Sequence, residues 1–318
     1  MRAVTIVDGA LRWLEHPDPV PGDSDLLIRV RAAGINAADL LQLRGGYPPP
    51  PGIAPDIPGL EVAGEVVAVG ALVTRFAPGD RAMALLGGGG QAELAAVHET
   101  AAVRVPDSVT WEAAGGFPEV FLTAYDALFA QAKLAIGDRV LVTGAAGGVG
   151  TAAVQMAAQA GAHVVASVRT AGMRPDVTRL GATESLEPEE AWRHGPFNIV
   201  LELVGGASVG SSLEALAIRG RIAVIGLGAG RTVELNLPLL MGRRAQIFGS
   251  TLRARNLAEK ATLVSQVETH VVPLLASGRL QVPVMATYGM AHADEAYRRH
   301  AQGGKLGKIV LVSEPAGH

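Results

Sequence analysis

A long uncharged stretch lies between Arg139 and Arg169, where no Asp, Glu, Lys or Arg occurs. It begins with a short β-branched run, passes through a glycine cluster, and continues as small residues in which Gln155 and Gln159 are one helical turn apart. It closes as a second apolar strand after Gly161. A strand that is buried on both faces shows an unbroken apolar run. The pattern therefore predicts strand, glycine turn, helix and strand in a parallel sheet, in preference to a membrane-spanning helix.

The alternation of strands and helices extends on both sides of this stretch. The expected elements are a helix over residues 122–134, strands over 197–206 and 220–230, a helix over 213–220 between them, and a strand over 245–252. This order is typical of a doubly wound sheet, so residues 119–256 are predicted to form one domain.

The first 118 residues have a different pattern, with short strands that are interrupted by glycine and proline. Such a pattern predicts a compact, barrel-like β domain in residues 1–118. The remaining segment, residues 257–318, follows one long helix predicted over 256–278 with a strand, a helix and a last strand. We expect this segment to return to the first domain, so that small-molecule ligands bind between the two domains.

The glycine cluster has the spacing of a dinucleotide-binding turn. Ala145, Gly147 and Gly150 occupy the positions of the G-x-G-x-x-G fingerprint, with alanine in the first. Without a side chain, Gly147 lets the backbone approach a pyrophosphate, and Gly150 lets helix and strand pack closely. The start of the helix, including Gly148 and Val149, supplies free N–H groups to the phosphates.

The end of the second strand indicates which dinucleotide binds. An NAD site usually places Asp or Glu there, whereas this chain has Ser167, Arg169 and Thr170, and the first acid downstream is Asp176. An arginine can pair with a 2′-phosphate that a carboxylate would repel. With Arg174 as a second cation nearby, the sequence favours NADPH; the alternative is that Arg169 is a solvated charge at the end of a strand.

Composition and charge exclude several classes of function. The chain of 318 residues has no cysteine, so disulfides, thiolate metal sites and a cysteine nucleophile are excluded. Its formal net charge of −3 gives no general attraction to nucleic acid or to an anionic membrane. The N-terminus lacks the layout of a signal peptide, so we expect a cytoplasmic protein with no nucleic-acid or membrane partner.

Several motifs in order carry a resemblance to a known family. They are "AAGINAADLLQLRGGYPPPPG", "IPGLEVAGEVVAVG", "FPEVFLTAYDALF", "LVTGAAGGVG", "GSTLRAR" and "GKLGKIVL". With these motifs the chain resembles the zinc-independent quinone oxidoreductases of the medium-chain dehydrogenase/reductase superfamily, the group that includes zeta-crystallin. The resemblance implies an α/β protein with a Rossmann doubly wound parallel sheet and a GroES-like β-barrel catalytic domain, NADPH as cofactor, and a homodimer.

The resemblance also indicates whether the chain has the ligands of a catalytic zinc ion. Zinc-dependent relatives hold a catalytic ion on a Cys, on a Gly-His-Glu segment and on a further Cys or Asp. Here Leu60 stands where the histidine would be, and the first ligand position falls near Ala38. Glu61 and Asp39 alone do not make the three-ligand site that a catalytic zinc needs. The sequence therefore predicts no metal.

The resemblance places three residues near the nicotinamide and the acceptor. Asn36 offers an amide to the acceptor or ribose, or else it stabilises a turn. Tyr47 lies in a proline-rich loop, where it stacks on the acceptor, donates to it, or only packs at the surface. Thr123 faces the nicotinamide ribose, or else it caps a helix that it opens.

Other cofactor contacts follow from the same resemblance and from strand ends. Gly226 and Leu227 lie at the carboxyl edge of a strand, where such sheets bind ligands. The resemblance further implies contacts of the cofactor with Ser250, Thr251, Leu252 and Lys305, although Lys305 could also be a solvated charge beside the last strand.

Together these features predict an enzyme that transfers hydride from NADPH to a quinone-like acceptor without metal. An enone or enoyl reductase in which Tyr47 donates the proton is a second interpretation. A cofactor-binding protein with little turnover is a third.

Overall fold

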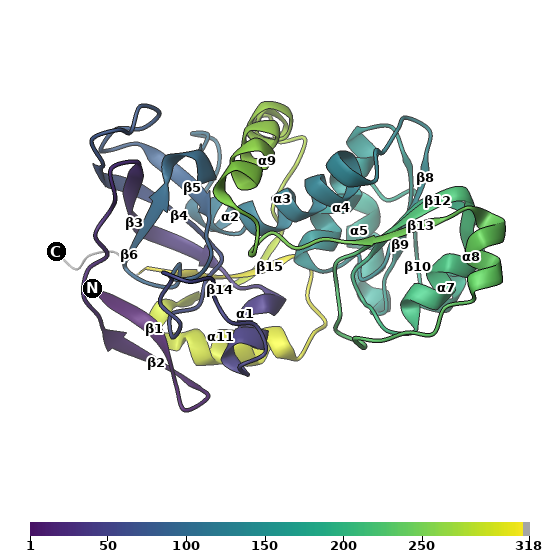
Figure 1. The fold of residues 1–318 in the computed structure, drawn as a ribbon, viewed down its shortest axis with the longest axis horizontal. Helices are drawn as coiled ribbons and strands as arrows, with labels where there is room; N and C mark the ends of the chain where they lie inside the picture. Colours follow the sequence, from purple (N-terminus) through teal and green to yellow (C-terminus); the bar gives the residue numbers. More distant parts are fainter. Residues whose placement is uncertain (314–318) are drawn as a thin grey trace. The chain divides into compact units, whose positions relative to one another are not determined.

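The computed structural model describes residues 1–313 (Figure 1). The chain forms two compact units. Unit 1 contains Met1–Leu122 and the segment that begins at Leu252, and unit 2 is Thr123–Thr251. The division falls within helix α3 (Pro118–Tyr125).

Unit 2 is built on a six-stranded parallel sheet with the order β10-β9-β8-β11-β12-β13. Its strands are β8 (Arg139–Val142), β9 (His163–Ser167), β10 (Glu184–Leu186), β11 (Phe197–Glu202), β12 (Leu216–Val224) and β13 (Gln246–Gly249). Its helices are a π-helix (Asp126–Gln131), α4 (Gly148–Gln159), η3 (Ala171–Met173), α5 (Arg174–Arg179), α6 (Pro188–Arg193), α7 (Ser208–Glu214) and α8 (Leu237–Arg243). The order reverses between β8 and β11, which is the point where such sheets bind ligands.

The apolar stretch of the sequence is the centre of this sheet. Val140, Leu141 and Val142 of β8 are fully buried, and Val164, Val165 and Ala166 of β9 are fully buried beside them. Burial on both faces explains why the stretch carries no charge. Within residues 1–313, no helix is long and apolar enough to cross a membrane.

Unit 1 contains the hairpin β1 (Arg2–Val7) and β2 (Ala10–Glu15) and a seven-stranded sheet. The sheet has the order β14-β15-β3-β4-β5-β7, and β6 pairs with β3. These strands are β3 (Asp25–Gly34), β4 (Glu61–Val69), β5 (Arg81–Leu85), β6 (Leu94–His98), β7 (Ala102–Arg104), β14 (Val284–Gly289) and β15 (Lys308–Val312). Its helices are α1 (Ala37–Leu43), η1 (Glu99–Ala101), α2 (Trp111–Gly115), α9 (Leu257–His270), α10 (Val272–Ala276), η4 (Met290–His292) and α11 (Ala293–Ala301). β15 pairs antiparallel with β3, so the last strand among the described residues joins the sheet of the first domain.

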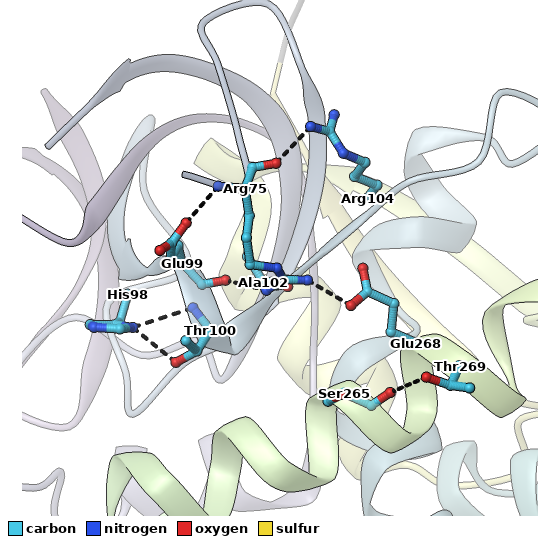
Figure 2. Close-up of polar contacts among 9 residues, drawn as sticks. All are labelled: Arg75, His98, Glu99, Thr100, Ala102, Arg104, Ser265, Glu268 and Thr269. Atoms are coloured by element: carbon cyan, nitrogen blue, oxygen red, sulfur yellow. Dashed lines mark hydrogen bonds and ion pairs between the residues drawn. The ribbon is translucent and has the colours of Figure 1, made fainter. Parts of the chain in front are cut away.

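Arg75 links the segment that begins at Leu252 to the N-terminal part of unit 1 (Figure 2). Its guanidinium donates to the carbonyl oxygens of Glu99 at 2.8 Å and Ala102 at 3.2 Å. It also pairs with Glu268 of α9 at 2.6 Å. The Arg75 backbone N–H donates to the Glu99 carboxylate at 2.8 Å. One arginine thus links α9 to η1 and to the start of β7.

Two of the predicted helices are wrong in extent. The helix predicted over 213–220 ends at Glu214, and Leu216 already belongs to β12, where it pairs with Phe197. Pairing with β11 overrides the helical propensity of this segment. The helix predicted over 256–278 is divided at Val271, and Pro273 lies in the first turn of the short α10.

Candidate active site

The glycine turn joins β8 to α4 and is tied to the neighbouring strand. The Ala145 N–H donates to the Ser167 carbonyl at the end of β9, at 3.1 Å. A Cβ on Gly150 would lie 2.6 Å from both the Cα of Ala145 and the carbonyl oxygen of Gly144, so only glycine fits there without a backbone shift. Close packing of helix and strand therefore requires glycine at this position, as the sequence predicts.

Gly147 differs from Gly150. A Cβ on Gly147 would meet only the Gly144 oxygen, at an ordinary 3.4 Å. The protein's own atoms do not require glycine here, and the missing side chain leaves space directly before the first turn of α4. That turn, with Gly148 and Val149, has N–H groups without partners inside the helix. The turn fits the pyrophosphate of a dinucleotide.

Sequence reasoning missed Glu202, which closes β11 beside this turn. Its carboxylate is fully buried, yet it is surrounded by donors. They are the Thr143 hydroxyl at 2.9 Å, the N–H groups of Val204 at 2.8 Å and Gly205 at 3.0 Å, and the hydroxyls of Ser208 at 2.8 Å and Ser212 at 2.9 Å. Glu202 thus joins the end of β8 to the start of α7. The available signal was a single acid at the end of an apolar strand, with two glycines three and four positions later.

The residues at the end of β9 that are predicted to bind the cofactor differ in their exposure to solvent. Ser167 is buried, whereas Arg169 and Thr170 are exposed. Within residues 1–313, the Arg169 guanidinium makes no hydrogen bond or ion pair. Arg174 instead donates from Nε to the Val168 carbonyl at 3.1 Å and lies 3.7 Å from Glu187. Arg169 is therefore available to a ligand, and Arg174 is partly engaged in holding the turn.

The residues after β12 and β13 that are predicted to contact the cofactor differ in packing, exposure and hydrogen bonding. A Cβ on Gly226 would lie 2.0 Å from the Leu203 carbonyl oxygen, so packing alone requires this glycine. Leu227 is 51% exposed. Ser250 donates to the Asp126 carboxylate at 2.7 Å, and Thr251 is exposed. Leu252 is 4% exposed and belongs to unit 1.

Thr123 does not open a helix. It lies inside α3, which begins at Pro118, so the capping alternative is wrong. Its side chain is half-buried, and within the part of the chain that the structure describes it has no polar partner. The predicted contact of Thr123 with the cofactor stays a prediction.

In unit 1, Asn36 belongs to a buried polar network. The Lys308 ammonium lies 2.6 Å from the Glu61 carboxylate, and it donates to the Asn36 side-chain oxygen at 2.6 Å and to the Ile35 carbonyl at 3.0 Å. The Asn36 amide in turn donates to Glu61 at 2.8 Å. These bonds use all three N–H groups of the ammonium and leave one N–H of Asn36 for a ligand.

Two further carboxyl groups border this network. Asp39 is buried and accepts from the N–H groups of Asn36 and Gly59, but burial still raises its pKa to about 6. The Glu119 N–H donates to Glu61 at 2.9 Å. Burial, and then the charge of Glu61, raise the pKa of the Glu119 carboxyl to about 8. This carboxyl has no hydrogen-bond or ion-pair partner among residues 1–313.

Tyr47 is half-buried beside an arginine that sequence reasoning also missed. The Arg253 guanidinium carbon lies 4.7 Å from the centroid of the Tyr47 ring, and its Nη1 donates to the Tyr47 carbonyl at 2.7 Å. Lys305 lies in the loop before β15, where burial and then the charges of Lys308 and Arg299 lower its pKa to about 8. Arg299 holds this loop by donating to the carbonyls of Gly303 and Gly304.

Within residues 1–313, no group of three or more His, Cys, Asp or Glu side chains is arranged to hold a metal ion. Leu60 is buried, and the neighbouring Glu61 carboxylate is already paired with Lys308.

Comparison with known proteins identifies the family. Residues 22–107 match the family described as Alcohol dehydrogenase GroES-like domain, and residues 148–267 match the one described as Zinc-binding dehydrogenase. A Quinone oxidoreductase-like protein 2 homolog of Nematostella vectensis is 31% identical over 303 residues, which cover 91% of this chain and 82% of the relative. The chain belongs to the quinone oxidoreductase-like group of the medium-chain dehydrogenase/reductase superfamily.

Other members of this superfamily agree in sequence and in fold. An acryloyl-coenzyme A reductase of Metallosphaera sedula is 32% identical over an alignment of 333 positions, which covers 94% of this chain and 95% of that protein. A mycobacterial protein solved in complex with NADPH is 27% identical, with a TM-score of 0.87 over 98% of this chain and 100% of its own. The predicted fold class, a Rossmann sheet with a GroES-like domain, is confirmed.

Proposed function

We propose that this oxidoreductase transfers hydride from NADPH to a quinone-like acceptor without a metal ion. The observation that carries the proposal is the carboxyl edge of the unit 2 sheet. There the turn leaves space at Gly147, and Arg169 is exposed and unpaired within the described residues, at the position where NAD sites carry an acid.

Each part of this edge has a role in binding. The N–H groups at the start of α4 hold the pyrophosphate, and Arg169 with Thr170 holds the 2′-phosphate. The relative solved with NADPH supports this choice of cofactor. When bound, the nicotinamide supplies the hydride, so the protein has to bind, orient and shield the reactants.

Catalysis without metal is supported by the surroundings of Glu61. A zinc site needs three protein ligands, whereas the chain has no cysteine and Lys308 already neutralises Glu61. Without a Lewis acid, an activated acceptor such as a quinone is reduced more readily than a simple ketone. We expect activity to survive EDTA; loss on chelation that zinc restores would overturn this part of the proposal.

Two copies of the chain are proposed to form a dimer through unit 2. β13 is an edge strand of the sheet, and the neighbouring helix α8 exposes Leu237 and Met241. Sedimentation of the purified protein tests this directly, and a monomer at micromolar concentration would contradict it.

A second candidate is reduction of an enone with Tyr47 as the proton donor. The acryloyl-coenzyme A reductase relative and the position of Tyr47 beside Arg253 favour it. Only this reaction must place a proton on carbon, and positioned acid catalysis contributes about 100- to 10,000-fold.

The test is steady-state NADPH oxidation with one panel of quinones and one of enones, for the wild type and Tyr47→Phe. As a quinone reductase, the variant keeps most of its turnover, because protons reach oxygen from water. Loss of turnover by more than about 100-fold would place the Tyr47 hydroxyl in the mechanism. Binding of NADPH without turnover on either panel would favour a cofactor-binding protein instead.

A further inference from the structure

Arg253 is a buried cation whose hydrogen bonds are made without a carboxylate. Its side chain is 6% exposed. It donates from Nε to the Gly87 carbonyl, from Nη1 to the Tyr47 carbonyl and from Nη2 to the Gln42 side-chain oxygen, each at 2.7 Å. Burying a charge costs free energy unless it is well hydrogen-bonded. This arrangement therefore needs a reason beyond packing.

The partners of Arg253 define one loop. Residues 44–55 contain no helix or strand, and Tyr47 with its run of prolines lies in this segment, here called the Tyr47 loop. Gln42 accepts from Arg253 and donates to the Pro55 carbonyl at 3.1 Å. Arg253 and Gln42 thus connect the start of the loop, Tyr47 and the end of the loop.

The chemistry of arginine matters in this arrangement. A guanidinium presents several N–H groups in a fixed plane, so it can reach three acceptors at once while its face lies on the Tyr47 ring. A lysine ammonium at the same place keeps the charge but cannot reproduce this geometry.

We propose that Arg253 is a positioning residue that fixes the Tyr47 loop and thereby sets the affinity of the enzyme for its acceptor. The proposal rests on the proposed function, in which Tyr47 lies on the acceptor side. It assigns no chemical step to Arg253, and three of the five N–H groups of the guanidinium already donate to protein acceptors.

Arg75 provides a matched control in the same unit (Figure 2). It too donates to backbone carbonyls, those of Glu99 and Ala102, and links a distant part of the sequence by its pair with Glu268. None of these partners lies in the Tyr47 loop. Arg75→Lys and Arg253→Lys therefore make the same chemical change in two different places.

The experiment compares both lysine variants with the wild type in quinone KM, NADPH dissociation constant and thermal stability. Loss of one or two hydrogen bonds predicts that Arg253→Lys raises the quinone KM by about tenfold or more. Its NADPH dissociation constant should stay within about twofold. Arg75→Lys should lower thermal stability while the KM stays unchanged. An equal rise of KM in both variants, or no rise in Arg253→Lys, overturns the proposal.

Hydrogen exchange of the Tyr47 loop gives a readout that needs no turnover. Arg253→Lys should speed amide exchange in residues 44–55, and Arg75→Lys should not. If the wild type reduces no quinone, the proposed function fails, while exchange still decides whether Arg253 fixes the loop. Unchanged exchange in Arg253→Lys would overturn the proposal whatever the activity.

Discussion

The cations that line the candidate sites of the two units are used in opposite ways. At the carboxyl edge of the unit 2 sheet, Arg169 is exposed and without a partner among the described residues, and Gly147 leaves space before α4. In unit 1, Lys308 and Arg253 are buried, and both donate to acceptors of the protein itself. An open edge suits a ligand that brings its own negative charge, whereas a closed network suits the fixing of a loop or strand.

The largest effect is expected in the closed network. Lys308→Met would leave the fully buried Glu61 carboxylate without its cation. Removal of one partner of a buried pair costs about 3–5 kcal/mol of the free energy of unfolding. Urea unfolding measures this loss. The double variant Lys308→Met with Glu61→Gln should recover part of it, and a loss below about 1 kcal/mol in the single variant would show that the pair is not critical for stability.

At the open edge, alanine substitutions of two glycines should differ in their effect on the free energy of unfolding, and both effects should be smaller than that of Lys308→Met. Gly150→Ala places a Cβ 2.6 Å from backbone atoms and should lower the free energy of unfolding by about 1–3 kcal/mol. Gly147→Ala meets only ordinary contact, so its stability should change by less than about 1 kcal/mol while NADPH binding weakens.

Unfolding curves and NADPH titrations of both glycine variants give the answer. Equal destabilisation of the two proteins would mean that Gly147 is also required by packing, and the argument for a phosphate there would lose its support.

The third effect is a change in pH dependence at Glu119. The pKa of this carboxyl is about 8 in the folded protein and near 4.5 when unperturbed. Between these values the folded state holds a proton that the unfolded chain has released, so stability falls as the pH rises. Glu119→Gln removes this contribution.

The wild type and Glu119→Gln should therefore differ in slope only within this window. The variant should gain stability relative to the wild type as the pH rises from about 4.5 to about 8, with no further relative change below about 4.5. Urea unfolding over this range tests it. Parallel curves throughout would contradict a raised pKa for Glu119.

The sequence predicts the open edge better than the closed network, and the reason is physical. The glycine turn, Ser167 and Arg169 lie within one strand–turn–helix–strand segment, so local periodicity and spacing reveal them. The partners of Arg253 are far away in the chain, and Gln42 is 211 positions from it. A single sequence carries no signal of such pairing.

Predictions from the local sequence pattern were also wrong where contacts with distant parts of the chain determine the structure. Residues 213–220 have helical propensity, but Leu216 pairs with β11 and the helix ends at Glu214. Glu202 was overlooked because its donors, among them Thr143 and Ser212, converge only in the folded sheet.

The most direct test of the account is the binding of NADPH and NADH to the wild type and to Arg169→Ala, measured by titration. If the open edge of unit 2 receives the 2′-phosphate, the variant loses about 1–3 kcal/mol of NADPH binding free energy, and NADH binding changes little. Equal losses for both cofactors, or no loss for NADPH, would contradict the account.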